Sequence, residues 1–482
     1  MSEVMCPVAL HAREAPQRLA VLAPHEALTY AELNAVINTA HANLLRTGLY
    51  DGNIVGIALP RSLPYIALLW AVLRAKMIAF PINPKYPVVY LSKTLGHVRC
   101  RTVIVPYGES DLVSWRKVHA LSPATLLQDN VTPVQGSVFT PDQPAVLVHT
   151  SGSTGSPKSA LLSWGNLYEN ASYANHNLPL QPGDRWLLSL PLYHVSGLGI
   201  VFRCLTAGAT IVIAGPTESY LEAIERYGIT HISLVPTQLY RMLQDPHAVT
   251  VLRCLKGILL GGAAASESLI ARVAEENLPV CTTYGLTETA SQVTTTALSD
   301  PKDKLKTAGR PIIPNTVRIN PQGIIEVCGP TLFLGYVHKT RVLRPVNQEG
   351  WFLTHDIGHV DKDGYLHVLG RADNVFQCGG ENVQPEEIER VLGRLPQVVQ
   401  AVVVPVPHAE WGAVPVAFVA QRDETPLDQE SLIKALREEL PPFKIPRHFL
   451  PWKAALPGDE IKWNRRNLSE RAQELIAAIR LS

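Results

Sequence analysis

A loop rich in hydroxyls and glycines follows an apolar strand, and it limits what this chain can fold into. The segment reads Leu147-Val-His-Thr-Ser-Gly-Ser-Thr-Gly-Ser-Pro-Lys158. Glycines let backbone N–H groups converge on an anion, hydroxyls add donors, and Lys158 adds a positive charge. The donors stand on Thr150, Ser151, Gly152, Ser153, Thr154 and Gly155. The segment therefore predicts a polyphosphate site at a strand end, with a Ser- and Gly-rich surface turn as the alternative.

Strands and helices alternate through the first 300 or so residues, which predicts an α/β fold with parallel sheets covered by helices. Several expected strands stop on small or polar residues, at 191–199, 236–238, 261–265 and 284–289. Ligands in open α/β sheets bind outside the carboxyl ends of the strands. We therefore expect these strand ends to meet in one crevice.

From residue 308 onward the pattern changes to short strands separated by turns, which predicts a small β-barrel-like part. The stretch Gly370-Arg-Ala-Asp-Asn374 has the character of a joint, and a small α+β pattern follows it. We expect a large domain over residues 1–372 and a small C-terminal domain over residues 373–482.

Charge and cysteine content exclude several classes of protein. The net charge is +1 over 482 residues, so the chain lacks the basic surface expected of a nucleic-acid or anionic-membrane binder. Its seven cysteines are scattered and never in CxxC spacing, which favours a reduced, cytoplasmic protein without a zinc site or disulfide framework. The most apolar run, residues 65–72, is too short to span a bilayer, and the N-terminus lacks a signal-peptide pattern.

Ordered motifs across nearly the whole chain resemble those of the adenylate-forming superfamily of acyl-CoA synthetases, luciferases and peptide-synthetase adenylation domains. Besides the loop, whose Pro157 departs from the Walker pattern, they are Tyr284-Gly-Leu-Thr-Glu288, Trp351-Phe-Leu-Thr-His-Asp356, Gly370-Arg371 and Gly379-Gly-Glu-Asn382. Five stretches are similar to the o-succinylbenzoate–CoA ligase branch, namely Leu190-Pro-Leu-Tyr-His-Val-Ser-Gly197, Ser233-Leu-Val-Pro-Thr-Gln-Leu239, Leu260-Gly-Gly-Ala-Ala264, Tyr284-Gly-Leu-Thr-Glu-Thr-Ala-Ser291 and Gly379-Gly-Glu-Asn-Val-Gln-Pro-Glu-Glu387.

The resemblance implies a reaction in two halves. A carboxylate attacks the α-phosphate of ATP to give an acyl-adenylate and diphosphate, and the thiol of CoA then displaces AMP. The branch implies o-succinylbenzoate as the acid, in menaquinone biosynthesis. The alternatives are a CoA ligase for another aryl or short acyl acid, and a non-catalytic nucleotide- or acyl-binding homologue. A peptide-synthetase adenylation domain is disfavoured, because no carrier domain follows Ser482.

For the nucleotide, the resemblance assigns Glu288 as the Mg²⁺ ligand, Thr287 as a contact of the α-phosphate and Asp356 as the acceptor of both ribose hydroxyls. Magnesium fits one carboxylate completed by phosphate oxygens and water, and a short ionised acceptor suits a vicinal diol. His355 stands where the family usually has glycine. The remaining ATP-binding residues are expected to be Lys158, Arg371, Tyr284 and Gly285, with Gly261, Gly262 and Ala263 lining the other face of adenine.

The resemblance also implies a catalytic lysine near the C-terminus, in contact with the α-phosphate and the reacting carboxylate. The corresponding stretch is Leu456-Pro-Gly-Asp-Glu-Ile-Lys-Trp-Asn-Arg465, in which the usual glycine is displaced to Gly458. Lys462 is the assigned residue. The alternatives are Lys453, Arg465 and Arg466.

His194 occupies the family's acyl-site position, beside Ser196 and Gly197, and we count it among the catalytic residues. o-Succinylbenzoate carries a second carboxylate, and a buried anion without a partner is costly. We hypothesise that Arg203 or His194 holds it, because Arg203 is a cation among apolar residues of a helix. Gly261 and Ser291 complete the expected acyl-binding set.

The joint at Asp373 resembles the hinge of the family, whose small domain is mobile. That domain rotates after adenylation, withdraws the lysine and brings Gly379, Gly380 and Glu381 toward the CoA channel. The expected partners are ATP, CoA and a small carboxylic acid, with no nucleic acid and no membrane span. The sequence leaves open whether the protein is a monomer or a homo-oligomer.

Overall fold

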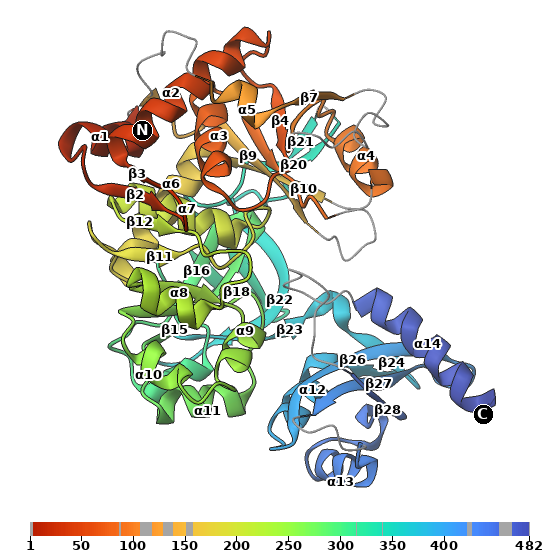
Figure 1. Cartoon of the computed structure of the whole chain (residues 1–482). Helices are drawn as coiled ribbons and strands as arrows, with labels where there is room; N and C mark the ends of the chain where they lie inside the picture. The colour runs from red at the N-terminus through yellow and green to blue at the C-terminus, as the bar shows by residue number, and fades with distance from the viewer. Residues whose placement is uncertain are drawn as a thin grey trace.

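The computed structural model describes residues 3–481 apart from 86–87, 107–117, 129–137, 151–157, 315, 340, 422–426 and 453–464. Two large sheets with their helices form the body of the molecule, and the C-terminal part lies to one side of it (Figure 1). Both large sheets are parallel at their centres and carry helices, which confirms the predicted α/β class. None of the described helices combines the length and the apolar character needed to cross a membrane.

The first large sheet has eight strands and carries both ends of the predicted phosphate loop. Its strands in spatial order are β21 (Arg341–Leu343), β20 (Gly335–His338), β10 (Lys158–Ser163), β9 (Pro144–Thr150), β5 (Ile78–Pro81), β4 (Ile54–Ile57), β6 (Thr102–Ile104) and β7 (His119–Leu121). The strands from β9 to β7 pair in parallel, whereas β10, β20 and β21 are antiparallel additions. Thr150 and Lys158 are register partners, so the two ends of the loop lie side by side.

The second large sheet has nine strands and delivers the predicted adenine and metal motifs. In spatial order they are β17 (Arg310–Pro311), β16 (Ser291–Thr295), β15 (Val280–Leu286), β14 (Gly257–Leu260), β13 (His231–Leu234), β11 (Arg185–Leu187), β12 (Thr210–Val212), β2 (Leu19–Leu22) and β3 (Ala27–Thr29). The strands from β15 to β2 are parallel. Strand β15 runs directly into the short helix η2 (Thr287–Thr289), as the position of the motif predicted.

Helices cover both sheets and pack into three buried clusters, of which the largest contacts both sheets. They are α1 (Pro7–Glu14), α2 (Tyr30–Arg46), α3 (Leu63–Arg74), α4 (Val88–His97), α5 (Pro123–Leu126), α6 (Trp164–Asn177), α7 (Val195–Ala207), α8 (Tyr220–Tyr227), α9 (Pro236–Met242), α10 (Ala248–Arg253) and α11 (Glu267–Glu275). Helix α2 begins with the predicted capping box, in which Thr29 and Glu32 satisfy each other's backbone N–H groups. Helices α6 and α7 lie between the two large sheets (Figure 1), and one buried cluster connects them to both sheets.

After residue 308, β17, β20 and β21 join the two large sheets. Up to residue 371, the other strands form an antiparallel sheet of β18 (Val317–Ile319), β19 (Ile324–Val327), β22 (Phe352–Val360) and β23 (Leu366–Arg371). Short elements outside the large sheets are β1 (Val4–Met5), β8 (Val138–Phe139) and η3 (Lys302–Lys306).

The C-terminal part follows the turn η4 (Ala372–Asn374). It contains β24 (Phe376–Cys378), β25 (Glu381–Val383), α12 (Pro385–Gly393), β26 (Val398–His408), β27 (Gly412–Gln421), α13 (Gln429–Glu439), η5 (Pro442–Lys444), β28 (His448–Pro451) and α14 (Arg465–Leu481). Its two buried clusters contain no described residue before Phe376. A separate core is what an independent domain needs, so this observation supports the domain boundary at residue 373, which stays a prediction.

Trp164 is the residue through which we expect the shared core to be most easily weakened. Its indole is buried, stacks on Phe139 with ring centroids 3.7 Å apart and meets Trp70 edge-on at 5.3 Å. Trp164→Ala should lower the free energy of unfolding by about 3–5 kcal/mol, because a large cavity replaces these contacts. Thermal unfolding measures the effect. The control Trp351→Ala removes a partly exposed ring, and an equal loss in both variants would contradict the prediction.

Candidate active site

Asp356 is the point at which three predicted nucleotide-binding residues meet. Its carboxylate is buried on β22; the Tyr284 hydroxyl donates to Oδ2 at 2.5 Å, and Arg371 Nη1 donates to Oδ1 at 3.2 Å. Asp356 and Arg371 are direct register partners across β22 and β23, while Tyr284 comes from β15. A carboxylate has about four lone-pair sites, so it can accept from several donors at once, including hydroxyls.

Arg371 connects this carboxylate to the predicted hinge. Its Nε and Nη2 donate to the two carboxylate oxygens of Asp373 at 2.7 and 2.8 Å. These bonds, together with the charge of Asp356, raise the pKa of Arg371 although burial opposes them, so the guanidinium stays charged. The structure therefore brings the predicted ribose acceptor, the predicted arginine and the first residue of the predicted small domain into one chain of contacts.

The end of β15 also carries Gly285, and here the structure gives a packing reason for the glycine. A Cβ atom at this position would lie 1.8 Å from the carbonyl oxygen of Ser291 on β16, so no side chain fits. Tyr284, one residue earlier, is partly exposed at the same strand end. Burial and the neighbouring Asp356 raise the pKa of Tyr284, so its hydroxyl keeps its proton and acts as a donor.

Glu288, the predicted magnesium ligand, lies in η2 next to Thr287 and is held at both its backbone and its side chain. The Phe333 N–H donates to the Glu288 carbonyl oxygen at 2.8 Å, and the Tyr336 hydroxyl donates to Oε1 at 2.5 Å. Lys158 Nζ lies 5.1 Å from the centroid of the Tyr336 ring. Sequence reasoning missed Tyr336, because its two partners come from distant segments and no motif marks it.

Part of the predicted site lies outside the described residues. This applies to Ser151, Gly152, Ser153, Thr154, Gly155, Lys453 and Lys462, while Thr150 is described only in its backbone. The two arginine alternatives to Lys462 are already engaged within the C-terminal part: Arg465 Nη2 donates to Glu389 Oε2 at 2.9 Å, and Arg466 pairs with Glu470.

Three of the residues predicted to line the acyl site, His194, Ser196 and Gly197, lie at the start of α7. His194 is its N-cap residue, and its ring lies 4.8 Å from that of Tyr193. Gly197 packs so tightly on Pro191 that a Cβ atom would come within 2.1 Å of the proline carbonyl oxygen. A Cβ atom at Gly199 would lie 3.5 Å from Ser291 Oγ, so this turn of α7 faces β16. Ser196 is half-buried in the same turn.

Arg203 lies further along α7 and is almost fully buried. It donates to the side chains of Asn175 at 2.8 Å and Gln292 at 3.2 Å, and Nη2 donates to two carbonyl oxygens of α6 and its C-cap. Its guanidinium lies 4.3 Å from the Trp186 ring centroid, and burial lowers the pKa of Arg203 to about 9. These contacts give Arg203 a structural role, so its predicted role as an anion anchor stays a prediction.

Two glycine-rich turns complete the predicted set. Gly261, Gly262 and Ala263 follow β14, the neighbour of β15, and Gly262 has a φ of +82°. Gly379 and Gly380 form the turn between β24 and β25, and Glu381 opens β25 with an exposed side chain. The first turn therefore lies at the strand ends near Tyr284, and the second belongs to the C-terminal part.

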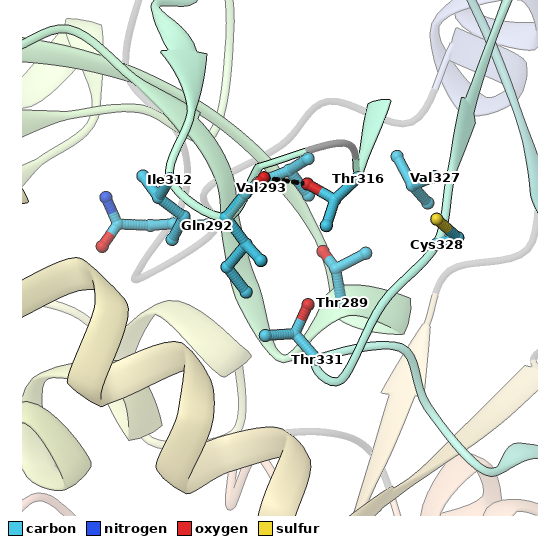
Figure 2. Close-up of a pocket in the computed structure, with 9 residues that line it drawn as sticks. Thr289, Gln292, Val293, Ile312, Thr316, Val327, Cys328 and Thr331 are labelled. Atoms are coloured by element: carbon cyan, nitrogen blue, oxygen red, sulfur yellow. Dashed lines mark hydrogen bonds between the residues drawn. The ribbon is translucent and has the colours of Figure 1, made fainter. Parts of the chain in front are cut away.

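A small pocket lies behind this site, between β16 and the four-stranded sheet (Figure 2). Its lining residues are Thr289, Gln292, Val293, Ile312, Ile313, Thr316, Val327, Cys328 and Thr331. None of them carries a charge, so the pocket does not suit a triphosphate. The described residues also contain no group of three or more His, Cys, Asp or Glu side chains able to hold a metal.

Comparison with known proteins agrees with this geometry. The family described as AMP-binding enzyme matches residues 8–337, and the AMP-binding enzyme C-terminal domain matches residues 387–459. The 2-succinylbenzoate–CoA ligase of Escherichia coli is 33% identical over 93% of this chain and 94% of its own length. These findings confirm the resemblance to the adenylate-forming superfamily and its o-succinylbenzoate–CoA ligase branch.

Two solved structures of o-succinylbenzoate CoA synthetase (MenE) from Bacillus subtilis share the fold. One, in complex with the acyl-adenylate intermediate OSB-AMP, has a TM-score of 0.87 and 28% identity, covering 97% of this chain and 98% of that chain. The other, in complex with ATP and magnesium ion, has a TM-score of 0.86 and 27% identity, covering 97% of this chain and 100% of that chain. The likeness extends through the C-terminal part.

Asp356→Asn tests the assignment of the ribose acceptor. The amide keeps the shape of the side chain but loses the charge that strengthens its bonds to hydroxyls, so we expect KM for ATP to rise at least about tenfold. AMP binding by calorimetry should weaken in parallel. Asp363→Asn is the matched control, because this exposed carboxylate pairs with Lys304 instead. Unchanged ATP and AMP affinities in Asp356→Asn would show that the ribose binds elsewhere.

Proposed function

The chain belongs to the family of AMP-binding enzymes, and from that premise we propose that it is an ATP-dependent acid–CoA ligase whose acid is o-succinylbenzoate. The reaction would pass through an acyl-adenylate and yield o-succinylbenzoyl-CoA in menaquinone biosynthesis. The observation that carries the proposal is the meeting of Asp356, Tyr284 and Arg371 at the end of β15, directly before Glu288. In this proposal Asp356 is the diol acceptor, Arg371 the cation and Glu288 the carboxylate for a metal.

The first half-reaction brings an anionic acid to an anionic triphosphate, so the site must supply positive charge where negative charge accumulates. Lys158 supplies one charge at the end of the loop, and Arg371 supplies a second beside Asp356. Asp356 would orient the ribose, and the Tyr284 ring would lie against adenine. Glu288 fits Mg²⁺, because this ion takes one carboxylate and completes its shell with phosphate oxygens and water; when bound, it neutralises phosphate charge.

The acid would lie at the start of α7. His194, Ser196 and Ser291 offer polar groups there, and Gly197 and Gly261 would line the cavity without side chains. Arg203 is one of the two cation candidates for the second carboxylate. Four of its five N–H groups donate to protein atoms, and one N–H on Nη1 has no acceptor among the described residues. A water molecule between Arg203 and the carboxylate would satisfy both groups.

For the second half-reaction, the small domain would turn about Asp373. Gly379, Gly380 and Glu381 would then face CoA, while Lys462 would serve the first half-reaction. The bond between Arg371 and Asp373 supports this assignment, because it couples nucleotide contacts to the joint. We further expect a cytoplasmic enzyme, and its oligomeric state stays open.

One observation favours a second candidate, a CoA ligase for an aryl or short acyl acid that lacks the second carboxylate. The guanidinium of Arg203 is already satisfied to a large extent inside the protein. An acid without a second anion would leave that network untouched. A non-catalytic homologue is the remaining alternative.

Exchange of labelled diphosphate into ATP separates these candidates. We expect the exchange rate with o-succinylbenzoate to exceed the rates with benzoate, succinate or short fatty acids by at least about tenfold. Each of these other acids lacks part of the o-succinylbenzoate molecule that the site would recognise. Exchange with another acid of the panel would identify the second candidate. Absence of exchange with every acid, despite ATP binding, would identify a non-catalytic homologue.

Arg203→Lys tests the anchor for the second carboxylate. Lysine keeps a charge but loses the planar fork, so KM for o-succinylbenzoate should rise about tenfold or more while KM for ATP stays constant. The rise should vanish for an analogue without the aromatic carboxylate. Arg253→Lys, which alters an exposed pair with Glu276, is the control. A variant that loses only thermal stability would leave Arg203 with its structural role alone.

A further inference from the structure

Tyr336 is a residue that no motif singled out, yet it touches two groups of the proposed ATP site. It lies on β20 opposite Ala160 of β10, two residues along the strand from Lys158. Side chains two residues apart on a strand point to the same face, and diagonal neighbours on adjacent strands reach each other when they are long. The pairing register therefore explains why the Lys158 ammonium lies 5.1 Å from the centroid of the Tyr336 ring.

The hydroxyl of the same ring reaches the second group. It donates to Glu288 Oε1 at 2.5 Å across 48 residues of sequence. An ionised carboxylate can only accept and a phenol hydroxyl can donate, so Tyr336 is the donor and Glu288 the acceptor of this bond. One aromatic side chain thus binds a carboxylate at its hydroxyl and a cation at its face.

The segment that carries Tyr336 is itself fixed against Glu288. The Phe333 N–H donates to the Glu288 carbonyl oxygen, and the Phe333 ring meets Tyr336 edge-on with centroids 4.8 Å apart. Asn166 of α6 donates to the carbonyl oxygen of Leu332 at 3.0 Å. Because the backbone just before Tyr336 is anchored to both η2 and α6, the ring has little freedom to leave Glu288.

From these contacts we propose that Tyr336 is a positioning residue, which turns the Glu288 carboxylate toward a divalent cation and holds Lys158 at a fixed distance from it. With Oε1 engaged by the hydroxyl, Oε2 is left for the cation. The ring face limits where the ammonium group can lie. The Tyr336 side chain would then set the distance between Lys158 and a divalent cation bound at Glu288. The inference rests on the proposed ATP-dependent function.

The test is the binding of Mn²⁺, as a probe for the divalent cation, to the full-length protein with a non-hydrolysable ATP analogue. Electron paramagnetic resonance measures free Mn²⁺ and does not depend on turnover. In Tyr336→Phe the affinity for Mn²⁺ should fall about tenfold, since the lost bond is charge-assisted. Binding of the analogue without metal, in EDTA, and the thermal unfolding temperature should match the wild type. In Tyr336→Leu, metal-free binding should fall as well, because Lys158 loses the ring.

Two further variants make the result specific. Tyr284→Phe removes a 2.5 Å bond to Asp356, so it should weaken analogue binding equally with and without metal. Tyr50→Phe changes a strongly exposed tyrosine and serves as the control for differences between protein preparations.

Equal Mn²⁺ affinity in Tyr336→Phe and wild type would overturn the inference. The inference would also fail if binding of the ATP analogue weakened equally with and without metal, together with a drop in thermal stability. If the wild-type protein bound no analogue at all, the proposed function itself would fail, and the inference with it. The two failures are distinguishable, because only the second affects the wild type.

Discussion

Carboxylates beside a triphosphate repel it unless each has its own donors, and this constraint shapes the site. Asp356 accepts hydrogen bonds from the Tyr284 hydroxyl and the Arg371 guanidinium. Glu288 accepts one from the Tyr336 hydroxyl. Each carboxylate is thereby fixed in direction, and part of its charge is offset before any ligand arrives. An acceptor held in this way suits a diol or a cation, whereas a freely rotating one would have to be ordered at the cost of binding free energy.

The scaffold supports this arrangement by drawing the side chains from three sheets. Tyr284 and Glu288 come from the end of β15 in the second sheet, Tyr336 comes from β20 in the first, and Asp356 comes from the four-stranded sheet. The three sheets keep their relative positions because α6 and α7 share a buried core with both large sheets. Arg203 adds polar ties between α7, α6 and β16 within that core. The site therefore depends on packing far from any residue that touches a ligand.

Local signals in the sequence predicted the elements and the individual motifs. The capping box at Thr29, the strand end before Glu288 and the acid at Asp356 each depend on residues close together in the chain. The hydrogen-bond partners of these residues could not be predicted from local signals, because the bond from Tyr336 to Glu288 joins segments 48 residues apart. His355 shows a different limit: it stands where the family usually has glycine, and its φ of +64° lies in the left-handed region that glycine favours. A residue pattern shows the substitution but not this backbone conformation.

One contact between the C-terminal part and the body is an exposed ion pair. Arg394, the C-cap residue of α12, donates to Glu267 of α11 at 3.0 Å and to Glu439 of its own part at 2.7 Å, and all three side chains are 40–47% exposed. Exposed ion pairs of this kind contribute about 0–1 kcal/mol. Each part keeps its own buried clusters, so the Arg394 contact with α11 can break without exposing apolar core. A rotation about Asp373 would then exchange solvated polar contacts for others of similar energy, which is the condition under which two orientations of a small domain can both be populated.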